Sequence, residues 1–290
     1  MPSNSVASGD DPIIIEDKVN RIRKVLLEDY QTNNQSYDEC DVQRVRDNDW
    51  TVLRFLKSNH MNEESALKSL TEAMQWRKTF GVNTTTDDYF PTDFYKIGGI
   101  FEYQTDKEGL PLLYFRVCVH HKVAELSEMI KQFFVHQVNK IDSRSDGQWA
   151  VVFDCSNGGL ANVDMDFARF ITQVMQCYFP KGYKYILIYE MPWIMAAFWK
   201  ITRTWLSNEV KEQIKSATGL EIFDFIDAEN VPQYIPGGKC QKSIHTIPEG
   251  VKAAELLPHI TFTEEQMKRF RTIFNIKDEE NGNSNNGDIH

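Results

Sequence analysis

Asp154, Cys155 and Ser156 are the residues whose types and adjacency could support covalent chemistry. They follow the apolar run 149–153, which is typical of a buried strand, and α/β proteins often place functional groups at strand ends. Cys155 could act as a nucleophile if a histidine lay beside it to accept its proton. The sequence places no histidine there, and the Asn-Gly-Gly segment 157–159 is typical of a turn. We therefore interpret these residues as a cap and turn that lead into the next helix.

Three histidines, His120, His121 and His136, raise the question of a metal site. Adjacent residues in a strand point to opposite faces, so His120 and His121 do not converge on one ion. No cysteine or carboxylate at a suitable spacing completes a tetrahedral set. We predict no metal and no cofactor, and we interpret the histidines as strand-end and helix-surface residues.

Motifs of common enzyme classes are missing from the sequence. There is no Gly-x-Gly-x-x-Gly after a strand, no phosphate-loop pattern, no Gly-x-Ser-x-Gly elbow and no His-Glu-x-x-His. Gly237, Gly238 and Lys239 form only a fragment of a phosphate loop, with no strand before them. We predict that the protein is not an enzyme. A hydrolase using Cys155 or Ser156 remains an alternative that requires a histidine within hydrogen-bond reach.

The composition of the chain limits the kinds of partner that we expect for the protein. The 290 residues carry a formal charge of −10, with 32 basic and 42 acidic side chains, which argues against general affinity for nucleic acid. The five cysteines form no Cys-x-x-Cys pair and the first residues lack a secretory pattern, so we expect a reduced, cytoplasmic, monomeric protein. The most apolar window, 185–201, is interrupted by Glu190, Pro192 and Lys200 and is too short to span a bilayer.

The first part of the chain reads as helical. Residues 1–11 and 278–290 are polar and rich in Ser, Asn, Gly and Asp, so we expect disordered tails there. Apolar residues recur at helical spacing between the first tail and residue 90. The sequence therefore predicts an all-α N-terminal lobe over 12–90, with helices at 15–30, 49–59 and 63–80.

Residues 91–238 change to a pattern of alternating strands and helices. Two β-rich runs flank the turn-forming segment 106–109, which suggests a hairpin-like antiparallel pair. The later alternation is typical of βαβ units. We predict an α/β fold whose mixed, mostly parallel sheet follows the helical lobe. The expected strands are 100–103, 112–119, 149–153, 185–189 and 214–217, and the expected helices are 125–141, 164–178 and 193–206.

The last of these helices carries an unusual number of aromatic residues. Ile194, Phe198, Ile201 and Trp205 follow a helical stripe, which we predict to face inward. Because neighbours on a helix cannot share one face, Trp193 or Trp199 is left outward. An exposed tryptophan suits a membrane interface, since its ring is amphipathic. We therefore predict membrane contact through Trp193 and Trp199.

Several motifs, taken in order, resemble the CRAL-TRIO (Sec14-like) lipid-binding family. They run from the helical segment at Asp49 to Gly238, through the hairpin at 106–111, the strand ending in Asp154 and the Tyr-Phe-Pro element at 178–180. Within the family, Asp164–Ile171 and Met191–Met195 are similar to the N-terminal domain of motile sperm domain-containing protein 2. That finer resemblance implies contact with the endoplasmic reticulum or other endomembranes.

The family resemblance implies a hydrophobic pocket floored by the sheet and closed by a helical gate, here residues 193–206. A lipid enters such a pocket when the gate opens at a membrane. The residues that we expect in the pocket and gate are Tyr114, Phe153, Phe167, Phe170, Val174, Tyr185, Leu187, Tyr189, Ile194, Phe198, Ile201 and Trp205.

Two positions bear on the ligand. Family members that bind phosphatidylinositol resemble one another in an acidic residue after the Tyr-x-Pro element and a lysine near the end of the gate. Our alignment puts Lys181 and Gln213 there, which argues against inositol recognition of that type, although Lys211 and Lys215 lie close to the second position. Glu190 replaces the family's usual asparagine, and we expect it to pair with a nearby lysine.

The C-terminal extension, 239–277, contains one more amphipathic helix. Thr263 and Gln266 form a capping-box pattern at its start. Its apolar face is expected to pack on the domain, while the alternative is that its basic face lies on an anionic membrane. The residues for that membrane contact are Lys268, Arg269 and Arg271.

The sequence thus predicts a non-enzymatic protein that binds a hydrophobic lipid in a gated pocket and carries or presents it between membranes. Its expected partners are the lipid and, transiently, a membrane surface. The alternative function is a module that docks to membranes or proteins and whose pocket is vestigial.

Overall fold

The computed structural model describes residues 12–145 and 147–276. The tails predicted at 1–11 and 278–290, and the last residue of the predicted C-terminal extension, lie outside the described residues. No helix within the described part of the chain is long and apolar enough to cross a membrane.

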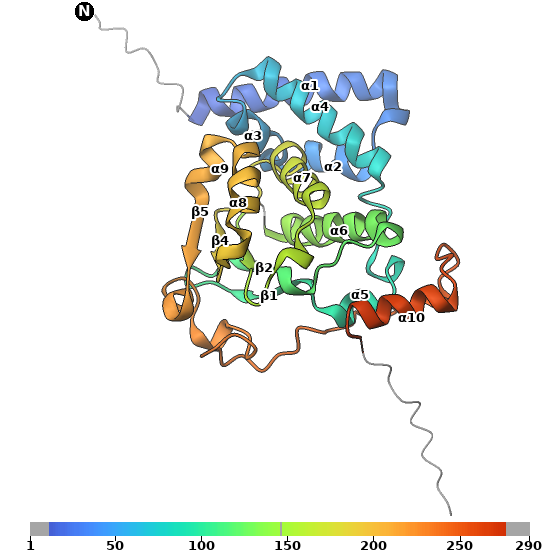
Figure 1. Cartoon of the computed structure of the whole chain (residues 1–290). Coiled ribbons are helices and arrows are strands. Elements are labelled where there is room, and N and C mark those ends of the chain that lie inside the picture. Colours follow the sequence, from blue (N-terminus) through green and yellow to red (C-terminus); the bar gives the residue numbers. More distant parts are fainter. Residues whose placement is uncertain (1–11, 146, 277–290) are drawn as a thin grey trace, which may run out of the picture.

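The N-terminal lobe is a layer of helices with its own apolar core (Figure 1). Capping explains why the longest predicted helix has the predicted bounds. The Asn62 side chain accepts a hydrogen bond from the Ser65 amide at 2.8 Å, and Gly81 ends the helix with φ +76°. The helices of the lobe are α1 (Pro12–Asn33), α2 (Glu39–Asp47), α3 (Asp49–Ser58) and α4 (Glu63–Phe80).

The second part of the chain is built on one sheet. Within the described residues, five strands form it in the order β1-β2-β3-β4-β5, with β1 antiparallel to β2 and every other neighbouring pair parallel. The predicted α/β class, with a mostly parallel sheet after an all-α region, is therefore confirmed. The strands are β1 (Ile100–Thr105), β2 (Pro111–Arg116), β3 (Ala150–Asp154), β4 (Ile186–Tyr189) and β5 (Ile214–Ala217).

The register of the strands separates two faces of this sheet. Phe115, Phe153 and Ile188 are partners on neighbouring strands, and so are Tyr114, Val152 and Leu187. Because side chains alternate along a strand, the two sets point to opposite sides. We call the side of the first set the front face and the side of the second the back face.

Helices cover the front face, and a chain segment that follows β5 covers the back face. The front core joins Leu113 and Val151 to apolar residues of the helices that connect the strands. The back core joins Leu112 and Val152 to residues between 222 and 240. The helices of this part are α5 (Thr92–Ile97), α6 (Ser127–Ser145), α7 (Met165–Gln173), α8 (Ala196–Thr202), α9 (Asn208–Gln213) and α10 (Glu264–Ile273).

Candidate functional site

A cavity of about 250 Å³ lies between the front face of the sheet and the helices that cover it. Its floor is formed by large apolar side chains that occupy alternate positions on the inner strands. These residues are Leu113, Phe115, Val151, Phe153, Ile186 and Ile188. The floor offers no charge, so it suits a hydrocarbon rather than a polar substrate.

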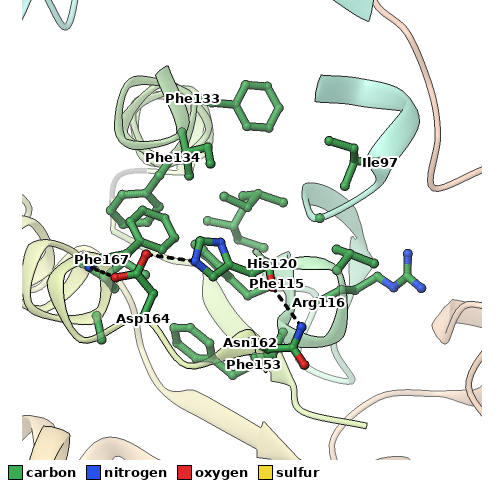
Figure 2. A pocket seen from close by; sticks show the side chains of 18 of the residues that line it. Ile97, Phe115, Arg116, His120, Phe133, Phe134, Phe153, Asn162, Asp164 and Phe167 are labelled. Atoms are coloured by element: carbon green, nitrogen blue, oxygen red, sulfur yellow. Dashed lines mark hydrogen bonds and ion pairs between the residues drawn. The ribbon is translucent and has the colours of Figure 1, made fainter. Parts of the chain in front are cut away.

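The cavity wall opposite the sheet comes from α6 and α7. Phe133 and Phe134 of α6 and Phe167 of α7 line it, and Figure 2 shows their rings around the same space as Phe115 and Phe153. The rings of Phe134 and Phe167 meet edge to face, with centroids 6.0 Å apart. This ring contact packs α6 and α7 against each other within the wall.

The predicted gate helix forms another wall, but it is rotated from the expected orientation. It consists of α8 between two short 3₁₀ segments, Trp193–Met195 and Arg203–Trp205. Ile194 and Ile201, predicted to face inward, are 39% and 49% exposed. The stripe that lines the cavity is instead Met195, Phe198, Trp199, Thr202 and Leu206.

Three predicted pocket residues line the cavity: Phe153, Phe167 and Phe198. Four others lie on the back face, where they pack in or against the back core. A strand residue on the back face cannot reach the front cavity, because successive side chains alternate. Those four residues are Tyr114, Tyr185, Leu187 and Tyr189.

The remaining predicted pocket residues sit beside the cavity. Phe170 and Val174 pack within the front core. Trp205 lies against the Arg169 guanidinium, 5.1 Å from its carbon to a ring centroid. Of the two tryptophans predicted to face a membrane, Trp193 is 86% exposed, whereas Trp199 lines the cavity.

One wall of the cavity is polar. His120 Nε2 lies 3.3 Å from Asp164 Oδ2, and Asp164 Oδ1 accepts hydrogen bonds from the first amides of α7. The Asn162 amide nitrogen donates to the His120 carbonyl at 2.9 Å (Figure 2). Burial lowers the pKa of His120, and its contact with Asp164 opposes that shift only in part.

Arg116, at the end of β2, brings a positive charge to the same region. Its guanidinium carbon lies 4.5 Å from the Tyr234 ring centroid, and Nη1 donates to the Gly98 carbonyl at 3.3 Å. Within the described residues, the buried Nε of Arg116 has no hydrogen-bond partner. The cavity lining is therefore mainly apolar, with one cluster of polar residues on this side. Further polar residues line it elsewhere, namely Asp93, Thr172, Gln176, Thr202 and Arg271.

The candidate nucleophiles lack the partner that catalysis would need. Burial raises the pKa of Cys155 to about 12, so its thiol carries a proton at neutral pH. The Ser156 hydroxyl donates to Asp154 Oδ1, at 2.5 Å. In the part of the chain that the structure describes, no histidine is bonded to either residue. The same residues contain no group of His, Cys, Asp or Glu arranged to hold a metal ion.

Two positions discussed for the ligand are engaged elsewhere. Lys181 forms an ion pair with Glu209 of α9. Glu190, expected to pair with a lysine, instead accepts a hydrogen bond from the Gly219 amide at 2.5 Å. Glu190 lies in a turn after β4 with φ +51°. Its carboxylate caps a backbone amide there instead of pairing with a lysine.

The C-terminal helix α10 contributes to the cavity, which sequence reasoning missed. Met267 and Phe270 line it, while Arg269 and Arg271 form ion pairs with the domain. Of the three basic residues considered for membrane contact, Lys268 is exposed and forms no ion pair within the described part of the chain. The helical periodicity of the sequence predicted the apolar face of α10. It could not predict the ion pairs of Arg269 and Arg271, because their acidic partners are distant in sequence.

Comparison with known proteins identifies the domain that holds this cavity. Residues 95–237 match the family model of the CRAL/TRIO domain. CRAL-TRIO domain-containing protein C3H8.02 of Schizosaccharomyces pombe is 24% identical over 204 residues, which are 66% of this chain and 46% of that protein. Phosphatidylinositol transfer protein CSR1 of Eremothecium gossypii is 25% identical over 204 residues, 65% of this chain and 46% of its own. The chain thus spans about half the length of these curated relatives.

The fold also matches a solved structure. The crystal structure of Sfh5 superposes with a TM-score of 0.63 over 90% of this chain and 97% of that chain, at 12% identity. The finer resemblance to motile sperm domain-containing protein 2 is not supported by these relatives and stays a prediction. The sheet order and the family match agree, and residues 95–237 form a CRAL/TRIO domain with a Sec14-like fold.

Proposed function

We propose that this chain binds one lipid in the front cavity and carries it between membranes without chemical change. The observation that supports this most directly is the apolar lining, which joins the sheet, α6, α7 and the gate around one space. Burying an acyl chain is worth about 0.8 kcal/mol per methylene, so a lipid leaves a bilayer only for similarly apolar surroundings. A charged or sugar-like substrate would gain nothing from these walls.

The polar side of the cavity is the place we assign to the lipid head. Arg116 brings hydrogen-bond donors to this side, next to the apolar floor, and His120 and Asn162 line the same side. The buried Nε of Arg116 has no hydrogen-bond partner among the described residues, so it would gain most from an acceptor on the lipid head. Two relatives are named for phosphatidylinositol transfer, alone or with phosphatidylcholine. Because Lys181 is paired with Glu209, we propose that the head is not held through an inositol ring at that position.

The outer side of the gate is the surface we assign to the membrane. Trp193, Ile194 and Ile201 are exposed there, and Lys200 and Arg203 are exposed on the same short segment. Apolar side chains enter the interfacial region of a bilayer, and nearby cations favour anionic lipids. The protein would then be cytoplasmic and bind peripherally to the endoplasmic reticulum or other endomembranes, as a monomer.

Native mass spectrometry of the protein purified from a eukaryotic host tests the proposal. A bound lipid at one per chain, released and identified by solvent extraction, is the expected result. Protein that stays empty after incubation with mixed liposomes contradicts a carrier role. If such empty protein still sediments with liposomes, the alternative of a docking module with a vestigial pocket replaces it.

A further inference from the structure

The C-terminal extension reaches the cavity from a different side than the gate. Figure 1 places α10 well away from α8 and α9, with α6 and α7 between them in the view. Nevertheless, residues of both segments line one cavity. Arg271 of the extension lines this end, and the apolar lining residues of the extension are Ile260, Phe262, Met267, Phe270, Phe274 and Ile276. The space therefore runs from the gate towards α10 and ends against it.

The side chains at this end are well packed. Met267 is 7% exposed and Phe270 is 4% exposed, and both belong to a core with Val123 and Leu126. The Phe262 and Phe270 rings meet edge to face, with centroids 5.1 Å apart. A wall of this kind does not yield to a hydrocarbon end without losing its own contacts.

Polar contacts anchor the wall to the domain. Arg271 Nε lies 2.9 Å from Asp93 Oδ1, and Arg271 Nη2 lies 3.0 Å from Glu255. Arg269 pairs with Glu125 at 3.2 Å. The His259 ring stacks on Tyr89, with centroids 4.2 Å apart.

The start of the helix is fixed as well. The Thr263 hydroxyl accepts from the Gln266 amide at 3.2 Å, and the Gln266 side chain accepts from the Thr263 amide at 2.9 Å. This capping box satisfies two amides that the helix itself leaves free. Helix α10 is thus held at its beginning and near its end.

We propose that α10 is the end wall of the lipid cavity and that Phe270, with Met267, sets the length of hydrocarbon chain that the cavity accepts. This inference rests on the proposed lipid-binding function. A chain that fits up to the wall gains the burial of every methylene. A longer chain must bend, displace the wall or leave methylenes in water, and each excluded methylene lowers affinity roughly fourfold.

Graded substitution of Phe270 tests the wall. Phe270→Ala and Phe270→Leu enlarge the end of the cavity, whereas Phe270→Trp shortens it. Each protein is incubated with vesicles of phosphatidylcholines whose acyl chains differ in length, and the retained lipids are measured by native mass spectrometry. Phe55→Ala serves as the matched control, because Phe55 is buried in the core of the N-terminal lobe and does not line the cavity.

The expected result is a shift to longer chains in Phe270→Ala and Phe270→Leu and to shorter chains in Phe270→Trp, with Phe55→Ala unchanged. Retention should rise roughly fourfold for each methylene newly accommodated. Phe270→Leu carries the test if the alanine variant does not fold. Identical chain-length distributions in folded variants and parent overturn the end-wall proposal. A parent protein that retains no lipid of any length instead overturns the proposed function.

Discussion

The Arg54 guanidinium contacts both carboxylate oxygens of Asp142, at 2.6 Å from Nη1 and 3.1 Å from Nη2. Both side chains are less than a tenth exposed, and Arg54 Nε also donates to the Pro180 carbonyl at 2.7 Å. Arg54 belongs to α3 and Asp142 to α6, so this pair joins the N-terminal lobe to the helices over the sheet. Arg54 also holds the connection between α7 and β4 at Pro180.

Removing one partner of this pair should be costly, because the other charge stays buried. Arg54→Met should lower the free energy of unfolding by about 3–5 kcal/mol. The control is Arg21→Met, which breaks the exposed pair with Glu63 and should cost no more than about 1 kcal/mol. Urea denaturation followed by circular dichroism measures both. Equal losses in the two variants would contradict the structural role assigned to the buried pair.

Neighbouring residues of β2 offer a test of the two faces. Leu113 lines the cavity, while Leu112 packs in the back core. Leu113→Trp should fill the cavity and abolish lipid retention while the protein stays folded. Leu112→Trp should overpack the back core, costing about 1–3 kcal/mol, yet keep the lipid.

Extraction and mass spectrometry of bound lipid, together with thermal melting, distinguish these two variants. Full lipid retention by Leu113→Trp would show that the ligand does not occupy the front cavity. Loss of lipid from both folded variants would show that the faces do not act separately.

Trp193 should anchor the protein to membranes. Transfer of its exposed side chain into the interface is worth about 1.5–3 kcal/mol by analogy with other large apolar side chains, so Trp193→Ala should reduce liposome binding by tenfold or more. Val25→Ala is the control, since Val25 is exposed on α1 of the N-terminal lobe. Liposome sedimentation gives both affinities. If the two variants bound liposomes with the same affinity, Trp193 and the gate would not form the membrane contact.

His120 should make stability depend on pH. Burial lowers its pKa in the folded protein, whereas an exposed histidine titrates near pH ~6.5. Between these values the unfolded chain binds more protons, so the free energy of unfolding falls as the pH drops below ~6.5 and is restored above it. His120→Gln should flatten this part of the profile.

The control for that measurement is His60→Gln, in an exposed turn. In urea denaturation at a series of pH values, this variant should show the same change in the free energy of unfolding with pH as the parent. A parent-like slope in His120→Gln would assign the pH dependence to other groups.

The fold was largely predictable because its local signals are strong. Asn62 and Gly81 mark both ends of α4, and the alternation of apolar runs and amphipathic helices gave the mostly parallel sheet. Helices α2, α5 and α9 were missed. They are short, with six to nine residues, and α9 is mainly polar, so their apolar periodicity is weak.

The cavity was harder to predict, for a reason visible in β2. Residues 112–115 are all buried, so the strand shows no alternation that tells front from back. The expected pocket therefore combined Phe153 of the front face with Tyr114 and Leu187 of the back face. Only the register across three strands separates them, and register depends on pairings between residues far apart in the sequence.

The predicted orientation of the gate helix was wrong for a related reason. Both of its sides carry large apolar residues, so periodicity alone does not decide which side is buried. The structure buries Met195 and Thr202 and leaves Ile194 and Ile201 at the surface. The contribution of α10 could not be foreseen either, because Asp93 and Glu125 lie far from Arg271 and Arg269 in sequence.

The separation of the two sheet faces has an evolutionary consequence. Positions that line the cavity and positions that pack in the back core alternate along the same strands. A substitution at Leu113 or Phe153 can reshape the chamber while Leu112 and Val152, pointing the other way, keep the sheet packed against its rear cover. Descendants of such a chain can change the shape of the cavity through single replacements that leave the back core intact.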